Sequence, residues 1–150
     1  MSDNFESLYE EIIRDHYKNP QHKKPLENIP FVQNPSCGDK VRVSITLGPD
    51  GTIAEAAFDG SGCSISMSSA DVLADLLQGK TPQEAKEMVE LFLAVLRGEK
   101  DVAELDTLGD AMAFRGVARL PVRLKCAALS WRAALEQLEN LMGTPKNYNS

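Results

Sequence analysis

The chain has 150 residues, enough for one domain with an ordinary hydrophobic core. Its 22 acidic and 16 basic residues give a formal net charge of −6, so we expect no broad electrostatic binding of nucleic acid or of an anionic membrane surface. No run approaches the roughly 20 apolar residues of a membrane helix. The acidic start MSDNFESLYEE is unlike a signal peptide, so we expect a cytoplasmic protein.

The N-terminal segment predicts an amphipathic helix that ends at Asn19 and Pro20. The residues that recur at helical spacing are Phe5, Leu8, Tyr9, Ile12, Ile13 and His16. Residues 19–35 contain four prolines and little periodicity. We therefore expect an extended surface segment without a regular element, leading to Cys37 on a loop.

Residues 40–47 alternate strictly, which predicts a half-buried β-strand. The side chains expected on its buried face are Val41, Val43, Ile45 and Leu47. The turn GPDG at residues 48–51 leads to a second strand over residues 53–59, in which Ala54, Ala56 and Phe58 share a side. The two runs predict an antiparallel hairpin.

Three longer helices are predicted after this hairpin. The first follows Cys63 and runs through Leu77, and the second begins at TPQE, residues 81–84, which matches a capping box with proline at the first helical position. Pro121 begins the last helix, whose apolar face is formed by Leu124, Ala127, Ala128, Trp131, Leu135, Leu138 and Met142.

The remaining segments are less regular. Residues 105–115 could hold a short helix, and residues 144–150 are polar and predict a tail. We detect no internal repeat and expect a single domain over residues 1–150.

The three cysteines lie at junctions between the predicted elements. Cys37 is in the loop before the hairpin, Cys63 lies between a strand and a helix, and Cys126 is in the opening turn of the last helix. An odd number of widely spaced cysteines argues against a disulfide framework and for reduced thiols. With Asp39, three thiolates make four ligands, enough for a tetrahedral zinc site.

Other interpretations of these residues stay open at this stage. Lone cytosolic cysteines are usually small buried residues, and the spacing by itself favours that interpretation. A Cys/His nucleophilic enzyme is a further alternative, although the sequence singles out no such pair. His16 continues an apolar stripe and indicates a packed or capping residue, while His22 in NPQHKKP indicates a solvated loop residue.

Four motifs together resemble the IscU/NifU-like family of iron–sulfur assembly proteins. They are DHYKNPQH at residues 15–22, SCGD at 36–39, GSGCSIS at 60–66 and RLKCAALSW at 123–131. Within the family the chain resembles the SufU branch. Lys125 precedes the last cysteine where IscU scaffolds usually have histidine, residues 99–117 form extra sequence, and RLPVRLK lacks the proline pair of IscU.

The resemblance implies an α+β fold of the SufE/NifU-like type, with a small three-stranded antiparallel sheet and helices packed on one face. It also implies that Cys37, Asp39, Cys63 and Cys126 bind zinc. The implied partner is a SufS-type cysteine desulfurase with pyridoxal phosphate, and downstream Suf assembly proteins would follow.

The resemblance implies a zinc-dependent sulfur acceptor, a sulfurtransferase that takes persulfide sulfur from the desulfurase for iron–sulfur cluster assembly. We expect Cys37, on its loop next to Gly38, to be the accepting thiol. The alternative is a scaffold that assembles and transfers a labile [2Fe–2S] cluster, because thiolates also hold such clusters. A third possibility is a zinc-stabilised domain without transfer chemistry.

Overall fold

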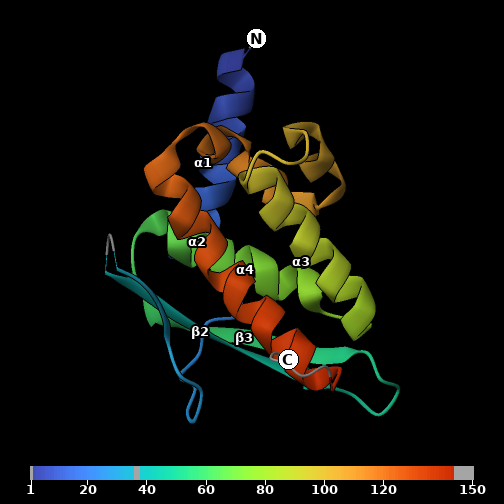
Figure 1. The fold of residues 1–150 in the computed structure, drawn as a ribbon. Coiled ribbons are helices and arrows are strands. Elements are labelled where there is room, and N and C mark those ends of the chain that lie inside the picture. Colours follow the sequence, from blue (N-terminus) through green and yellow to red (C-terminus); the bar gives the residue numbers. More distant parts are fainter. Residues whose placement is uncertain (1, 36–37, 144–150) are drawn as a thin grey trace.

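The computed structural model describes residues 2–35 and 38–143, and these fold into a three-stranded antiparallel sheet with helices on one side (Figure 1). The elements in chain order are α1 (Ser2–Lys18), β1 (Val32–Asn34), β2 (Asp39–Leu47), β3 (Ile53–Ser61), α2 (Ser64–Leu77), α3 (Pro82–Leu96), the 3₁₀ helices η1 (Val102–Thr107) and η2 (Gly109–Arg119), and α4 (Pro121–Leu141). Helix α4 packs on β2, α2 packs on β3, and α3 packs on α4. The α+β fold class is confirmed.

The β2–β3 hairpin follows the sequence pattern except at Leu47, which is half-buried, and at Ala54. Val41, Val43 and Ile45 are buried as predicted. Thr46 pairs with Glu55 while Leu47 pairs with Ile53, so Ala54 is an extra residue in a β-bulge and is exposed. The prediction that Ala54 shares a side with Ala56 and Phe58 is therefore wrong, because the bulge shifts the alternation.

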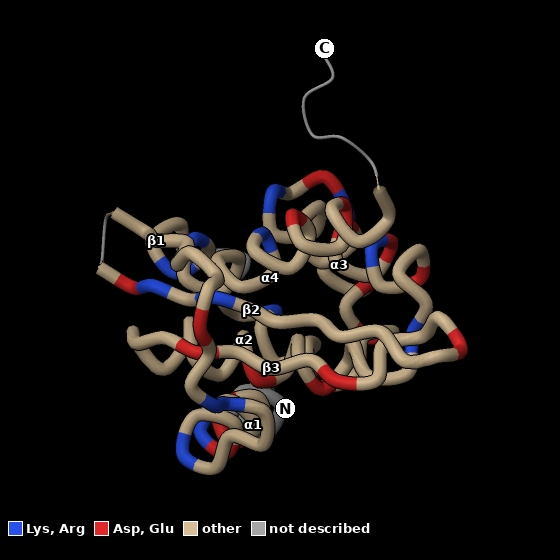
Figure 2. Tube along the Cα trace, turned by 90° about the horizontal axis from the view of Figure 1, so that it is seen from below, with Lys and Arg blue, Asp and Glu red and all other residues tan. Residues whose placement is uncertain are grey.

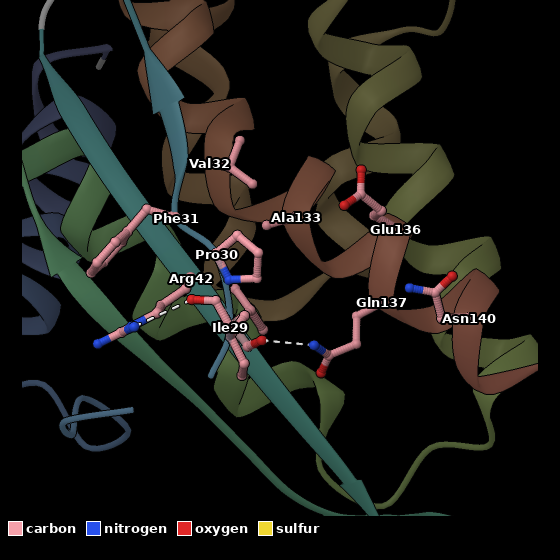
Figure 3. A pocket seen from close by; sticks show the side chains of 10 residues that line it. Ile29, Pro30, Phe31, Val32, Arg42, Ala133, Glu136, Gln137 and Asn140 are labelled. Atoms are coloured by element: carbon pink, nitrogen blue, oxygen red, sulfur yellow. Dashed lines mark hydrogen bonds between the residues drawn. The ribbon is translucent and has the colours of Figure 1, made fainter. Parts of the chain in front are cut away.

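The extended segment before the hairpin also contains a strand that the sequence pattern did not predict. Residues 32–34 form β1 and pair with β2, in the strand order β1-β2-β3. Beyond β1, the Gln137 side chain of α4 bonds to the edge of β2: its Oε1 accepts from the Ile45 N–H. Its Nε2 donates to the Val43 carbonyl at 3.0 Å, the bond marked at Gln137 in Figure 3. One amide side chain thus satisfies two backbone groups that a longer β1 would have paired.

The outer face of the sheet carries charged side chains. Lys40 and Arg42 alternate with the buried valines of β2, and their cationic groups lie 4.8 and 4.2 Å from the ring centroid of Phe31. Arg42 also pairs with Asp59 of β3 at 2.9 Å. Lys and Arg are mixed with Asp and Glu over the elements (Figure 2).

The helix boundaries follow local rules. The predicted capping box is confirmed: Thr81 accepts from the Glu84 N–H and the Glu84 side chain accepts from the Thr81 N–H. Gly98, with φ +81°, follows the end of α3. Residues 102–119 hold two 3₁₀ helices instead of the single short helix expected at 105–115.

Aromatic side chains join the helices. Trp131 of α4 stacks on Phe92 of α3 with ring centroids 3.8 Å apart, and Phe114 of η2 meets Phe92 edge-on at 6.2 Å. The Trp131 indole N–H donates to the Ser69 hydroxyl at 2.9 Å, and this hydroxyl donates to the Ala127 carbonyl at 2.7 Å. This cluster fixes α4 against α2 and α3. No helix in the described part of the chain is long and apolar enough to cross a membrane.

Candidate metal centre

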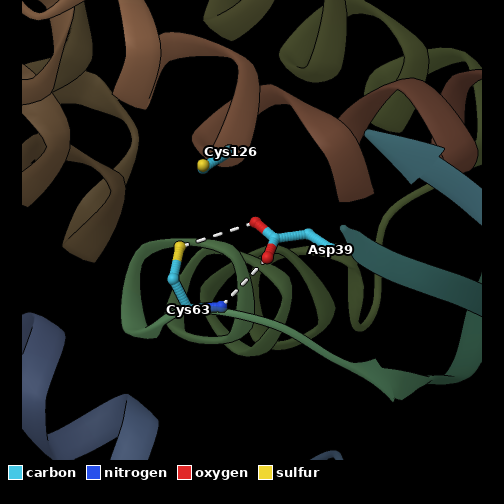
Figure 4. Close-up of side chains that lie close together, drawn as sticks. All are labelled: Asp39, Cys63 and Cys126. Carbon is cyan, nitrogen blue, oxygen red and sulfur yellow. Dashed lines mark hydrogen bonds between the residues drawn. The ribbon is translucent and has the colours of Figure 1, made fainter. Parts of the chain in front are cut away.

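Three predicted ligands come together at one end of the sheet. Asp39 is the first residue of β2, Cys63 is the N-cap of α2, and Cys126 lies in the second turn of α4. Their side chains point toward one another (Figure 4), and one ligand atom from each lies within 4.8 Å of the others. Cys126 thus sits one turn further into α4 than the opening turn expected from sequence.

The carboxylate of Asp39 is held from two sides. Its Oδ1 accepts from the Cys63 backbone N–H at 3.2 Å, and its Oδ2 accepts from the Ser66 hydroxyl. The Cys63 sulfur lies 3.5 Å from the same Oδ2. Asp39 is only 3% exposed and Cys126 only 2%. A buried carboxylate that accepts hydrogen bonds from donors on two sides keeps one orientation.

Two glycines make room for this arrangement. A Cβ on Gly60, whose φ is +147°, would lie 2.2 Å from the Lys40 carbonyl oxygen across the hairpin. A Cβ on Gly62 would lie 2.7 Å from Asp39 Oδ1. The GSGC motif therefore contains glycine where the backbone approaches β2 and where it approaches the carboxylate.

Replacing Gly62 with alanine is expected to weaken zinc binding by about tenfold, because the new methyl group displaces the Asp39 carboxylate from its donors. Competition with a chromophoric chelator measures the affinity. Gly116→Ala is the matched control, since Gly116 is exposed and a Cβ there meets nothing within 4 Å. An unchanged affinity in Gly62→Ala would contradict this account of how Asp39 is placed.

The donor set suits a thiophilic ion. Thiolates and carboxylate oxygens are both zinc ligands, which lie about 2.0–2.3 Å from the ion and hence about 3.3–3.8 Å from each other. The three ligand atoms lie within 4.8 Å of one another, so they must approach slightly to bind one zinc ion. Cys37 lies outside the described residues; its neighbour Gly38 has φ +74° and donates to the Asn34 carbonyl at 2.9 Å.

Neither histidine lies at this centre. His16 binds two carboxylates: its Nδ1 lies 2.6 Å from Asp71 Oδ2 and its Nε2 lies 2.8 Å from Asp110 Oδ2. The prediction of a packed His16 agrees with this ion-paired position. His22 is less solvated than expected, since its ring lies 3.1 Å from Asp75 and its side chain is 20% exposed.

Asp71 is a residue whose importance the sequence patterns missed. It is fully buried in α2, and its Oδ1 accepts from the backbone N–H groups of Gln21 and His22, both at 2.9 Å. Together with His16, these bonds tie α1 and the following turn to α2. The available signal was a carboxylate within an otherwise apolar helical face, which requires a buried partner.

The His16 ion pair makes stability depend on pH. The hydrogen bond to Asp71 is the main cause that raises the pKa of His16 from 6.5 to about 9; burial opposes the increase, and the bond to Asp110 adds to it. The stabilisation is therefore complete below pH 6.5 and is lost as the pH rises through about 9.

We expect His16→Gln to lower the free energy of unfolding by about 2 kcal/mol at pH 6 and by much less above the folded-state pKa. Urea denaturation of the metal-free protein across this range measures the difference between variant and wild type. A difference that stays constant with pH would contradict the assignment of a charged His16.

Comparison with known proteins places these features in a family. The family model described as the NifU-like N terminal domain matches residues 8–138. The chain belongs to this family. Its motifs from residue 15 to residue 131 lie inside the match, so the resemblance inferred from the four motifs is confirmed.

Relatives in the family have two different names. The zinc-dependent sulfurtransferase SufU of Bacillus subtilis (strain 168) is 42% identical over 133 residues, covering 87% of this chain and 88% of that protein. The iron–sulfur cluster assembly scaffold protein IscU of Streptococcus pyogenes serotype M1 is 35% identical over 134 residues, covering 88% and 83%. The chain is thus similar to iron–sulfur cluster assembly proteins over most of its length.

Solved structures agree on the fold. A proposed iron–sulfur cluster assembly scaffold protein for the SUF system, FiSufU from Fervidobacterium islandicum AW-1, has a TM-score of 0.74 and 32% identity, with 85% of this chain and 94% of that chain covered. The N-terminal part of a NifU-like protein from Brucella abortus has a TM-score of 0.76 at 18% identity, covering 93% and 98%. The second likeness supports the NifU-like fold alone.

Proposed function

We propose that this protein is a zinc-dependent sulfur acceptor that takes persulfide sulfur from a SufS-type cysteine desulfurase for iron–sulfur cluster assembly. The observation that carries the proposal is the convergence of Asp39, Cys63 and Cys126, from three separate elements, to within 4.8 Å. The similarity to a SufU named as a zinc-dependent sulfurtransferase supports the choice of zinc and of sulfur transfer.

Cys37, Asp39, Cys63 and Cys126 would hold the zinc ion in this proposal. When bound, zinc keeps thiolates ionised and shielded from oxidants. Asp39 reaches the centre in a fixed orientation, and Cys126 contributes from a buried position in α4.

We propose Cys37 as the accepting thiol. Cys63 is the N-cap of α2 and Cys126 is inside α4, so the backbone of each is held by a helix and cannot move with its sulfur. Cys37 is followed by a glycine in the left-handed region, a residue type that permits backbone rotation. Its thiolate attacks the outer sulfur of the desulfurase persulfide. The S–S bond of the donor breaks, the desulfurase cysteine leaves as a thiolate, and Cys37 carries the persulfide.

Adding the zinc-loaded protein to a matched desulfurase is expected to raise alanine production from cysteine several-fold, because an acceptor unloads the enzyme's persulfide. Cys37→Ala, loaded with zinc as far as it binds, and metal-free protein serve as controls and should not stimulate. If the zinc-loaded protein leaves the alanine rate unchanged, the transfer proposal fails.

The second candidate is a scaffold for a labile [2Fe–2S] cluster. The similarity to a protein named as an IscU scaffold favours it, and the same thiol and carboxylate set suits iron. Protein purified without oxygen distinguishes the two. Colourless protein with one zinc per chain supports sulfur transfer, and brown protein with iron and labile sulfide supports the scaffold.

A further inference from the structure

We propose that Ser66 is a positioning residue of the metal centre, whose hydroxyl holds the Asp39 carboxylate in the orientation that presents it to the ion beside Cys63. This inference rests on the zinc-binding part of the proposed function and is independent of sulfur transfer. It adds a residue to the centre that is not itself a ligand.

Ser66 is placed between two of the ligands. It lies in the first turn of α2, three residues after the N-cap Cys63. The side chains of Ser66 and Cys63 are therefore neighbours on the same side of the helix. Its hydroxyl donates to Asp39 Oδ2, and its Oγ lies 3.7 Å from the Cys63 sulfur. Ser66 is 2% exposed, so water does not compete for these contacts.

The contact to Ser66 completes the restraint on the carboxylate. The Cys63 N–H fixes Oδ1 and the Ser66 hydroxyl fixes Oδ2, so the plane of the Asp39 carboxylate cannot rotate without breaking a hydrogen bond. An ionised carboxylate offers about four lone-pair sites, so accepting these two hydrogen bonds is compatible with binding an ion. Residues that orient a metal ligand through such hydrogen bonds change metal affinity about 10–100-fold when removed.

Ser66 also lies beside two groups, the Asp39 carboxylate and the Cys63 sulfur, that would both be anionic as zinc ligands. The Asp39 carboxylate and the Cys63 sulfur are 3.5 Å apart, and a thiolate there repels the carboxylate. A hydroxyl within reach of both groups can donate to either of them. A methyl group at this position offers neither bond.

Neighbouring serines provide an internal comparison. Ser68 is fully buried in the same helix, but its hydroxyl donates to the backbone carbonyls of Ser64 and Ile65 and does not contact the three grouped ligands. Loss of the Ser68 hydroxyl should therefore leave the metal centre unchanged, whereas loss of the Ser66 hydroxyl should not.

The test measures metal binding and not transfer activity. Zinc affinity is determined by chelator competition, and the coordination by the visible spectrum of the cobalt-substituted protein. Ser66→Ala is expected to bind zinc about tenfold more weakly and to change the cobalt spectrum, while Ser68→Ala keeps both. Threonine and valine side chains have nearly the same shape, but only threonine has a hydroxyl. Ser66→Thr should therefore bind zinc more tightly than Ser66→Val.

A double-mutant cycle decides whether Ser66 acts through Asp39. In an Asp39→Ala background, Ser66→Ala should cause no further loss of zinc affinity. Equal affinity and identical cobalt spectra for wild type and Ser66→Ala would overturn the proposal, as would an equal loss in Ser68→Ala. A protein that shows the expected Ser66 dependence but does not stimulate a desulfurase would refute sulfur transfer and leave this inference standing.

Discussion

Replacing Asp71 with alanine is expected to lower the free energy of unfolding by about 3–5 kcal/mol, the usual consequence of removing one partner of a buried ion pair. Asp71 is fully buried and accepts from His16 at 2.6 Å. It also accepts from the backbone N–H groups of Gln21 and His22. The substitution removes one of the two carboxylates that contact the His16 imidazolium. It also leaves the backbone N–H groups of Gln21 and His22 without this acceptor, and each loss lowers the free energy of unfolding.

Urea denaturation of the metal-free protein measures the effect of Asp71→Ala. Asp110→Ala is the matched control, because Asp110 contacts the other nitrogen of His16 but its side chain is 55% exposed. We expect that control to cost less than about 1 kcal/mol. Similar small losses in both variants would show that the Asp71 cluster does not anchor α1.

Removing any one of the four proposed zinc ligands is expected to weaken zinc binding by about 100-fold, since an apparent binding free energy of about 10–16 kcal/mol is shared among four ligands. The variants are Cys37→Ala, Asp39→Ala, Cys63→Ala and Cys126→Ala. Chelator competition on each protein measures the loss. A zinc ion bound by Asp39, Cys63 and Cys126 would connect β2, α2 and α4. Removal of zinc should therefore also lower the thermal midpoint of the wild type.

His22→Ala is the control for these ligand variants, because its ring contacts Asp75 and lies outside the group formed by Asp39, Cys63 and Cys126. It should keep the wild-type zinc affinity. Full zinc retention in two of the cysteine variants would end the four-ligand hypothesis.

Local signals in the sequence predicted most of the elements. The alternation of residues 40–47, the capping box at residues 81–84 and Pro121 at the start of α4 each depend on contacts between near neighbours. These signals placed β2, α3 and α4 correctly. They also placed Cys63 at a helix N-terminus, where the structure has it.

The parts that the sequence patterns missed depend on distant residues. Strand β1 has three residues and exists because β2 offers it an edge. The bulge at Ala54, the edge closure by Gln137 and the anchor at Asp71 likewise depend on partners in other elements. Periodicity within one segment carries no information about such partners.

The metal centre could be predicted only in part from local signals in the sequence. Separations of 26 and 63 residues between the cysteines match no short zinc motif, so spacing alone favoured ordinary buried cysteines. The resemblance of the motifs to a family supplied the ligand set, and the fold brings Asp39, Cys63 and Cys126 together. Ser66 could not be identified in advance, because its contact with Asp39 joins two elements.

The most direct test of the central claim follows sulfur from cysteine to this protein. The zinc-loaded chain is mixed with a SufS-type desulfurase and radiolabelled cysteine, separated without reductant, and digested after alkylation. We expect label on the chain at Cys37 first, released by dithiothreitol, and none in Cys37→Ala. Absence of label, or label present only as acid-labile sulfide together with iron, would contradict the sulfur-acceptor account.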